Sequence, residues 1–403
     1  MAPMSIMAIQ LGWIGFTTVR AQVFSLFLLV TLLNLLEGDR ARKRLWPLLW
    51  LLLYVIWLNA HAGFLLGAGM LVFYSLERFV KAMLQERSFS KALKRTWHLL
   101  TVLSVMCVLT VANPWGADYI PYLWRAITLD RSGFIGEWSP LWLSEPWSLP
   151  LFLISIVFVI YSLVHTRCQN YSLLAFLCVT AWLALWHFRY LSIYALAWIC
   201  FVPAHIQDTN IGRFLIAFSA RKRIVYVGIF LLIGIGGSLV AVRNKFWTVR
   251  IPTPTVEHEK IDGLVYPVGA VQFLKDRQFV GNIMAPFEAG SYLSWKLYPA
   301  VKVSMDSRFE VAYALPLVLQ NVRFYRGQED WENIPYRHST DAILVPNWSK
   351  LGKTANCSIG KEETNLFTKV YIDDGYSIFM RASISDRIGF TDKRGTHFQD
   401  VFP

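Results

Sequence analysis

The chain has 403 residues, of which 55% are hydrophobic and only 16% are charged. Because about a quarter of the residues in an ordinary soluble domain are charged, this composition excludes a protein that is soluble throughout. The formal net charge of +12 does not indicate nucleic acid, since the basic residues cluster between apolar runs, as they do in membrane proteins. We therefore expect membrane lipids as partners and no nucleic acid.

Residues 1–243 carry the apolar runs and are predicted to form a transmembrane helical domain with about nine spans. The run from Leu45 to Glu77 has no charge before its final residue. It is too long for one crossing, because about 20 helical residues span the bilayer core. It therefore predicts two helices that meet at a polar turn containing Asn59 and His61. The nine spans are predicted at approximately residues 4–18, 21–36, 45–58, 62–79, 99–112, 150–164, 171–187, 190–206 and 224–242.

The charges between these spans predict their orientation. Segments 37–44, 80–98 and 207–223 are basic, whereas segment 113–149 contains several Asp and Glu residues. Since basic loops remain in the cytoplasm, the N-terminus is expected to be cytoplasmic and the C-terminal domain extracytoplasmic. The predicted location is the inner (cytoplasmic) membrane.

Five polar side chains of the apolar half then fall on the extracytoplasmic side: Arg20, Asn59, His61, Glu137 and Arg189. Ionisable residues near membrane depth are functional candidates by default. His61 would be a catalytic base, a contact to sugar or phosphate, or a hydrogen-bonded turn residue. Arg20 and Arg189 would either snorkel to lipid headgroups or bind the phosphate of a lipid carrier. Asn59 would contact the substrate beside them.

Segment 113–149 is rich in Trp, Pro and Tyr. Aromatic rings prefer the headgroup level, so we expect this outer loop to lie along the membrane interface as one or two amphipathic helices. It would be either an aromatic anchor or a wall beside a lipid-linked substrate. In the second case Glu137 is its catalytic acid/base candidate.

Residues 251–403 read as a soluble α/β domain, preceded by a linker with Pro252 and Pro254. Strands that alternate with helices predict a largely parallel sheet. Asp306 and Arg308 follow the predicted strand VKVSM, at the end where α/β sheets bind ligands. They are predicted substrate-binding residues, with a structural ion pair as the alternative. Helices are predicted at VGAVQFLKDR, SYLSWKLY and VAYALPLVLQNVRFY, and strands at NIMAPF, VKVSMDSR, DAILVP and twice in 366–381.

Common catalytic signatures are missing from the sequence. We find no phosphate-cradling Gly-rich loop of the P-loop type, no G-x-S-x-G and no H-E-x-x-H. The five cysteines have neither disulfide-framework nor metal-ligand spacing, so no metal ligands are predicted.

A family resemblance rests on six segments. They are R-x-Q-x-F-S from Arg20, WLNAHAGFLLG from Trp57, NPWG from Asn113, GEWSP from Gly136, HFRY from His187, and residues 288–313. Together they resemble a bacterial family of polytopic membrane proteins. That family is similar to the glycosyltransferase C superfamily, which includes protein mannosyltransferases and lipid A aminoarabinose transferases. The resemblance extends over nearly the entire chain.

The resemblance implies a polyprenyl-phosphate-linked sugar as donor, a protein or glycan as acceptor, and inverting transfer on the extracytoplasmic face; it leaves a divalent cation open. It also implies an acidic base in the first outer loop, on an N-terminal segment with an Asp and a Trp-His pair. That segment is expected to be missing here, so the chain would be a fragment or a divergent relative without the base. The leading hypothesis is a glycosyltransferase-like membrane protein for envelope glycan assembly. The alternatives are a non-catalytic scaffold or partner subunit of the same fold and, third, a transporter, for which no internal repeat is found.

Overall fold

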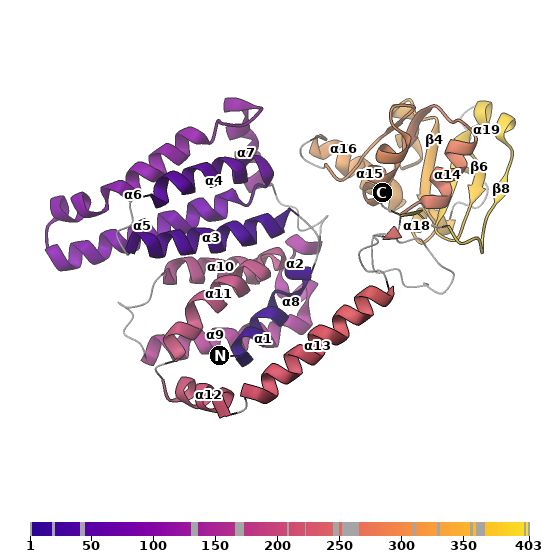
Figure 1. The fold of residues 1–403 in the computed structure, drawn as a ribbon. Helices are drawn as coiled ribbons and strands as arrows, with labels where there is room; N and C mark the ends of the chain where they lie inside the picture. Colours follow the sequence, from indigo (N-terminus) through magenta and orange to yellow (C-terminus); the bar gives the residue numbers. More distant parts are fainter. Residues whose placement is uncertain are drawn as a thin grey trace. The chain divides into compact units, whose positions relative to one another are not determined.

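The computed structural model divides into two compact units, Met1–Leu232 and Ile233–Pro403, and we describe each by itself (Figure 1). The predicted linker prolines, Pro252 and Pro254, lie outside the described residues. The structure describes residues 2–17, 21–40, 45–129, 136–165, 173–207, 209–221, 223–244, 250–251, 266–308, 312–328, 331–354, 358–359, 367–398 and 400–401.

The first unit is helical throughout its described part. Its α-helices are α1 (Ala2–Leu11), α2 (Trp13–Thr17), α3 (Gln22–Arg40), α4 (Trp46–Ala60), α5 (Phe64–Glu86), α6 (Phe89–Leu109), α7 (Tyr119–Thr128), α8 (Leu141–Ser144), α9 (Leu149–His165), α10 (Leu174–Trp186), α11 (Leu191–Ile206), α12 (Asn210–Arg221) and the start of α13 (Arg223–Asn244). Short 3-10 turns lie between them at η1 (Gly116–Asp118), η2 (Gly136–Trp138), η3 (Pro146–Ser148) and η5 (Phe188–Tyr190). Each of the nine predicted spans falls on one or two of these helices.

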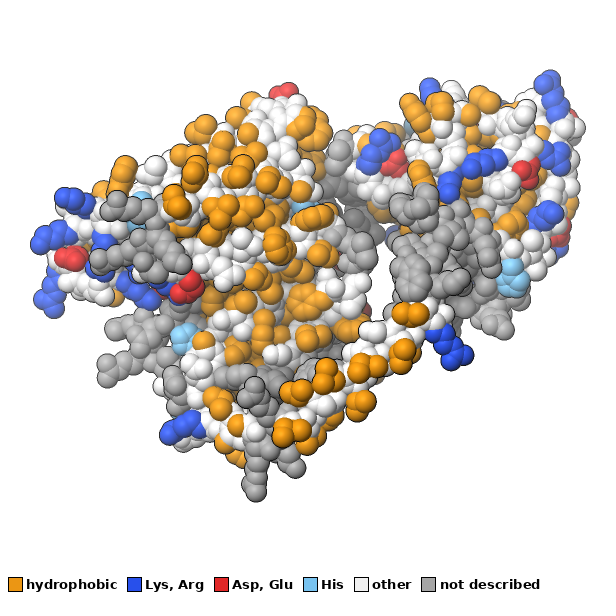
Figure 2. All heavy atoms as spheres, viewed as in Figure 1, with side chains coloured by type: hydrophobic (Ala, Val, Ile, Leu, Met, Phe, Trp, Pro, Cys, Tyr) orange, Lys and Arg blue, Asp and Glu red, His pale blue; other side chains and the backbone are white. Residues whose placement is uncertain are grey.

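Five helical stretches in the described part of the chain are long and apolar enough to cross a membrane, which identifies an integral membrane protein. Helices α4 and α10 are apolar but shorter. In Figure 2 hydrophobic side chains cover α13 and much of the visible face of the helical unit. The five stretches are Gln22–Arg40, Phe89–Leu109, Pro146–His165, Phe188–Ile206 and Val227–Asn244.

The basic segments predicted as loops are largely helical. Helix α3 continues to Arg40, α5 ends at Glu86, α6 begins at Phe89, and α12 occupies most of segment 207–223. Hydropathy marks where the apolar layer ends, but a helix that continues into water keeps its own backbone hydrogen bonds. Figure 2 shows Lys and Arg side chains gathered where α5 meets α6. The basic residues of these two helix ends are Lys81, Arg87, Lys91, Lys94 and Arg95.

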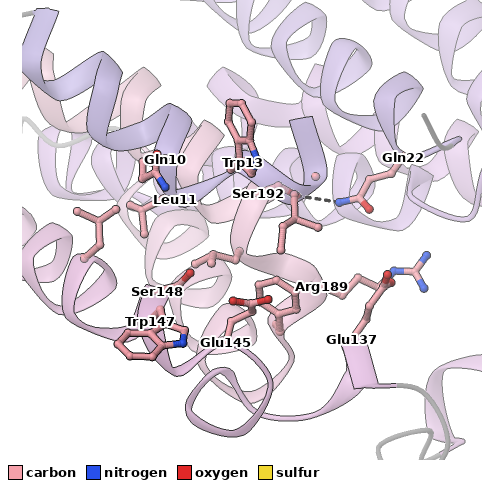
Figure 3. A pocket seen from close by; sticks show the side chains of 15 residues that line it. Gln10, Leu11, Trp13, Gln22, Glu137, Glu145, Trp147, Ser148, Arg189 and Ser192 are labelled. Atoms are coloured by element: carbon pink, nitrogen blue, oxygen red, sulfur yellow. Dashed lines mark hydrogen bonds between the residues drawn. The ribbon is translucent and has the colours of Figure 1, made fainter. Parts of the chain in front are cut away.

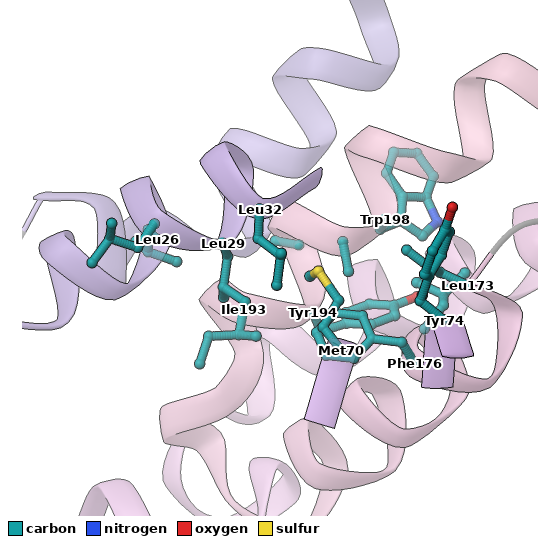
Figure 4. Close-up of a cluster of buried hydrophobic side chains, with 14 of the residues drawn as sticks. Leu26, Leu29, Leu32, Met70, Tyr74, Leu173, Phe176, Ile193, Tyr194 and Trp198 are labelled. Carbon is teal, nitrogen blue, oxygen red and sulfur yellow. The ribbon is translucent and has the colours of Figure 1, made fainter. Parts of the chain in front are cut away.

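Aliphatic and aromatic side chains fill the helical core (Figure 4), and some of the aromatic ones bring their polar atoms to partners in other helices. Trp198 of α11 is fully buried, and its indole N–H donates to the carbonyl of Ser155 in α9 over 3.0 Å. The hydroxyls of Ser155 and Tyr194 are 2.7 Å apart. Such bonds stabilise helix pairs in a medium that offers no water as an alternative partner.

The second unit contains a mixed sheet in the order β3-β2-β4-β7-β6-β5, with β8 beside β6. Strands β3, β2 and β4 are parallel, as are β6 and β8, but β4–β7, β7–β6 and β6–β5 are antiparallel. The expectation of a largely parallel sheet is therefore wrong. The tight turn at 373–375 joins β6 directly to β7, and a connection that short permits only antiparallel pairing. The strands are β2 (Gly281–Met284), β3 (Val301–Val303), β4 (Ala342–Pro346), β5 (Ser358–Ile359), β6 (Phe367–Ile372), β7 (Tyr376–Arg381) and β8 (Thr391–Asp392), and β1 (Arg250–Ile251) pairs with β9 (Asp400–Val401).

Strand β4 is buried on both faces, so its residues alternate between two hydrophobic clusters. Ala342 and Leu344 belong to one cluster, and Ile343 and Val345 to the other. Pro316 lies in the first turn of its helix, where proline costs no hydrogen bond. The helices of this unit are α14 (Val268–Asp276), α15 (Phe287–Leu297), α16 (Leu315–Tyr325), α17 (Ile334–Arg337), α18 (Lys350–Thr354) and α19 (Ala382–Ile388), with a 3-10 turn η7 (Trp331–Asn333).

Candidate functional site

A pocket of about 230 Å³ lies within the helical unit. Its lining comes from α1, α2, α3, α9 and α11 and from the turns η2, η3 and η5, so residues far apart in sequence meet there (Figure 3). Polar side chains share this lining with aromatic and aliphatic ones, in contrast to the apolar helix surfaces outside. The polar side chains are Gln10, Gln22, Glu137, Glu145, Ser148, Arg189 and Ser192.

Two segments singled out in the sequence, GEWSP and HFRY, dock directly on each other. The backbone N–H of Phe188 donates to the carbonyl of Ser139 over 3.1 Å. The Nδ1 of His187 donates to the carbonyl of Trp138 over 2.7 Å, and the two rings stand edge to face, with centroids 5.6 Å apart. These contacts fix η2 against η5, and each turn supplies one charged residue to the pocket.

The charged residues of the pocket are one guanidinium and two carboxylates. Arg189 packs over the ring of Trp138, with its guanidinium carbon 5.3 Å from the ring centroid, a cation–π geometry. Glu137 and Glu145 are half-buried and line the same cavity. Trp147, which is 90% exposed, lies at its edge. The pocket thus brings one guanidinium and two carboxylates to the same cavity.

Another part of the pocket lining is neutral and hydrogen-bonded. The side-chain amide of Gln22, in α3, donates to the hydroxyl of Ser192, in α11, over 2.8 Å. Figure 3 shows this pair beside Arg189. Both residues are buried, so the bond holds α3 to α11 and fixes the orientation of the amide oxygen. That oxygen remains able to accept a hydrogen bond, since only the nitrogen of the amide donates to Ser192.

Gly15→Ala is expected to destabilise the helical unit and to distort the pocket that Gly15 lines. An added Cβ would lie 2.4 Å from both Cβ and Oγ of Ser192. Because a Cβ cannot rotate away, α2 would have to move from α11, at a cost of about 1–3 kcal/mol. Gly69→Ala is the matched control, since a Cβ at Gly69 meets nothing within 4 Å. Thermal unfolding in detergent measures both variants, and an unchanged melting temperature for Gly15→Ala would contradict the close packing.

His61 belongs to a buried hydrogen-bond chain next to this region. The indole N–H of Trp57 donates to Ser25 Oγ over 2.9 Å, and Ser25 Oγ lies 2.7 Å from His61 Nδ1. The backbone N–H of Gly63 also points at Nδ1, over 3.2 Å. Since that N–H must donate, Nδ1 accepts and the proton of a neutral ring resides on Nε2. Ser25 then donates to the ring, which holds His61 in one orientation.

His61 does not line the pocket, although Arg189 affects it. Burial, with a smaller contribution from the Arg189 guanidinium, lowers the pKa of His61 below its ordinary value. The ring is therefore neutral at pH 7, as a proton acceptor requires. Among the residues that the structure describes, no hydrogen-bond partner is found for Nε2. The geometry agrees with the simpler interpretation of a hydrogen-bonded turn residue, and a role as base stays a prediction.

The remaining predicted residues lie apart from the pocket. The side-chain amide of Asn59 donates to the carbonyls of Val55 and Ala112, each over 2.9 Å, which joins the end of α4 to the segment after α6. Arg20 falls outside the described residues.

In the C-terminal domain, Asp306 and Arg308 form a two-point ion pair. The guanidinium donates to both carboxylate oxygens over 2.6–3.0 Å. Burial opposes ionisation of Asp306, but the hydrogen bonds from Arg308 outweigh it and lower the pKa of the carboxyl. Neither residue lines a pocket described here. The contacts match the structural ion pair, and ligand binding by these residues stays a prediction.

Part of the pocket lining is not predicted from the sequence. Gln22 lies within the R-x-Q-x-F-S segment, and Glu145 is one of the acidic residues of the outer loop. Ser192 carries no signal in the sequence, because a single serine in an apolar helix is commonplace. Among the described residues, no group of three or more His, Cys, Asp and Glu side chains is placed to hold a metal ion. No protein-family model matches the chain, and no curated protein matches its sequence.

Proposed function

We propose that the chain is a glycosyltransferase-like membrane protein that binds a polyprenyl-phosphate-linked sugar in this pocket, on the extracytoplasmic side, for assembly of an envelope glycan. The observation that carries the proposal is that Arg189, Glu137 and Glu145 line one cavity in a membrane-embedded helical unit. The family resemblance at GEWSP and HFRY supports it, because these two segments supply Glu137 and Arg189.

The proposed chemistry needs one cation and one base. Arg189 binds the phosphate that links lipid to sugar, through charge-assisted hydrogen bonds. Glu137 takes the proton from an acceptor hydroxyl, whose oxygen attacks the anomeric carbon. The bond from that carbon to the phosphate oxygen breaks, and its electron pair stays on the polyprenyl phosphate. Glu145 and the Gln22 amide oxygen accept hydrogen bonds from sugar hydroxyls.

The size of the pocket indicates which part of the donor enters it. About 230 Å³ is below the usual range of 300–1,000 Å³ for drug-sized ligands, so the pocket accommodates a head group and not a lipid. The polyprenyl chain would lie on apolar surface nearby. The pocket lining itself offers such a surface, with Trp13 54%, Ile14 41% and Trp147 90% exposed.

Binding of a synthetic polyprenyl-phosphate mannose to the full chain in nanodiscs tests the proposal. Arg189→Ala should weaken binding about 10- to 100-fold, the value of one or two charge-assisted hydrogen bonds. Arg189→Lys should restore part of the loss. Arg125→Ala is the control, because Arg125 is exposed on α7 and does not line the pocket.

Two outcomes separate the hypotheses. Glu137→Gln should retain binding and abolish transfer to an acceptor if the protein is an enzyme. A wild-type chain that binds the donor but transfers nothing would favour the non-catalytic scaffold. Binding that is unaffected in Arg189→Ala would remove the assignment of this pocket altogether.

A further inference from the structure

A second pocket lies entirely within the C-terminal domain and has a volume of about 600 Å³. Pro286 follows β2 by two residues and Pro346 ends β4, and both line it. The pocket is therefore at the carboxyl ends of two parallel strands, the place where open α/β sheets bind ligands. Asp306 and Arg308 follow the third parallel strand, but they are paired with each other and lie outside this pocket.

The floor of this pocket is rigid. The hydroxyl of Tyr325 donates to the carbonyls of Met284, over 3.1 Å, and Leu344, over 2.8 Å. It thereby ties the end of β2 to β4. Tyr376, which is 1% exposed, forms the adjoining floor from β7. A floor fixed by two strands holds the side chains around it in constant positions, which lowers the entropic cost of binding.

The rim carries four exposed polar side chains and one tryptophan, beside Ser349, whose hydroxyl donates to the carbonyl of Pro346 over 2.7 Å. Trp348 stands edge-on to the ring of Tyr376, with centroids 5.1 Å apart, and is 38% exposed. Glu288, Arg326, Gln328 and Lys350 are exposed, and within the described residues no side-chain hydrogen bond or ion pair is found for any of them. One cavity is thus surrounded by an aromatic surface and by hydrogen-bond donors and acceptors of these four side chains that are not paired with one another.

This combination selects among ligand classes. Sugar hydroxyls both donate and accept, so they suit a carboxylate, an amide and cations together, and the apolar face of a pyranose suits an indole ring. A phosphate ligand would meet the Glu288 carboxylate, and no Gly-rich loop lines the pocket among the residues that the structure describes. A volume of about 600 Å³ is typical of small-molecule sites, and it admits one or two sugar units but no folded partner.

We propose that this pocket is a carbohydrate-binding site, with a pyranose ring packed on Trp348 and its hydroxyls bonded to Glu288, Gln328 and Arg326. It is distinct from the pocket at Arg189, and the inference does not rest on the function proposed for that pocket. A glycan held here would be recognised by the C-terminal domain itself, whatever chemistry the helical unit performs.

The test is ligand-observed saturation-transfer NMR on the full chain in nanodiscs. The probes are maltotetraose, chitotetraose and tetragalacturonate, with inorganic phosphate and ADP as non-sugar comparators. At least one oligosaccharide should bind, and its affinity should fall about tenfold or more in Trp348→Ala and in Glu288→Gln. Trp295→Ala is the matched control, because Trp295 is 48% exposed in the same domain and lies outside the pocket. It should bind as the wild type does.

Several results would overturn the proposal. These are a lack of binding by all three oligosaccharides, equal losses in Trp348→Ala and Trp295→Ala, or binding of phosphate or ADP that Trp348→Ala leaves unchanged. Trp348→Phe keeps an aromatic ring and should retain most of the affinity. If it does, the loss of affinity in Trp348→Ala comes from the missing ring, and a loss in both variants would indicate misfolding. Arg189→Ala should not alter oligosaccharide binding at this pocket. The test of the carbohydrate site can therefore fail or succeed independently of the test of the donor pocket at Arg189.

Discussion

Replacing Asp39 with alanine should lower the stability of the helical unit by about 3 kcal/mol, because a buried charged acceptor would be lost from a four-helix junction. Asp39, in α3, is 9% exposed. It accepts from the indole N–H of Trp46 over 3.1 Å, from the hydroxyl of Tyr74 over 2.7 Å and from Nε2 of His98 over 2.8 Å. These three partners come from α4, α5 and α6.

The size of this effect lies between a low and a high estimate of the free energy of each hydrogen bond. Interhelical hydrogen bonds in membrane proteins contribute about 0.6 kcal/mol each on average, which would give about 2 kcal/mol for three. Hydrogen bonds to a charged acceptor are stronger, about 1.5–3 kcal/mol each. The alanine variant also leaves the Trp46 N–H buried without its acceptor. Asp39→Asn should lie between alanine and wild type, since it keeps one oxygen but not the charge.

Glu37→Ala is the control for Asp39→Ala. Glu37 is an acid on the same helix, and it forms an exposed pair with Arg40. Exposed pairs contribute about 0–1 kcal/mol, so this variant should unfold nearly as the wild type does. Denaturation in mixed micelles of sodium dodecyl sulfate measures all three variants. If Asp39→Ala is no less stable than Glu37→Ala, the junction does not hold the four helices together.

The junction also shows what the sequence does and does not predict. Hydropathy predicts nine spans, because the membrane imposes long apolar runs, and five helical stretches in the described part of the chain are long and apolar enough to cross. Hydropathy also predicts that the second span ends at residue 36 and that Asp39 lies in a loop, whereas α3 continues to Arg40. The carboxylate is buried only because partners on three other helices meet it, at sequence separations of 7, 35 and 59 residues. No periodicity in one segment encodes such a meeting.

The pocket in the helical unit is likewise predicted only in part from the sequence. The charge pattern predicts that Glu137 and Arg189 lie on one side of the membrane. Their joint lining of one cavity depends on the backbone bond from Phe188 to Ser139, and such main-chain contacts leave little trace in side-chain identity. His61 was a candidate because of its type and position. Its bond to Ser25 has a structural purpose that spacing alone does not reveal.

Replacing Asp373 with alanine should weaken the β6–β7 hairpin by about 2–3 kcal/mol. The carboxylate is 3% exposed and accepts from the backbone N–H groups of Gly375, over 2.8 Å, and Tyr376, over 2.7 Å. It also accepts from the hydroxyl of Tyr371 over 2.8 Å. Asp373→Asn keeps an oxygen for the two backbone groups, so it should stay within about 1 kcal/mol of the wild type at pH 7.

The same carboxylate predicts an unusual pH dependence. Burial raises the pKa of Asp373 above its ordinary value, despite the hydrogen bonds that it accepts. The folded domain therefore holds the proton more tightly than the unfolded chain, whose pKa is about 3.9. Stability from this group is present below that value and is lost as the pH rises through the folded-state pKa. Asp373→Asn cannot ionise and lacks this loss.

Hydrogen exchange of the amides in 367–381, in the full chain and corrected for intrinsic rates, measures the opening free energy from pH 4 to pH 8. Other carboxyls, such as Asp306 with its lowered pKa, give the opposite slope in both proteins. The difference between wild type and Asp373→Asn removes them, because they are common to the two. As the pH rises, the opening free energy of the wild type should fall relative to that of Asp373→Asn. A difference that is constant with pH would mean that Asp373 titrates normally and that its three donors balance its burial, and a difference that shifts in favour of the wild type would mean that they outweigh it.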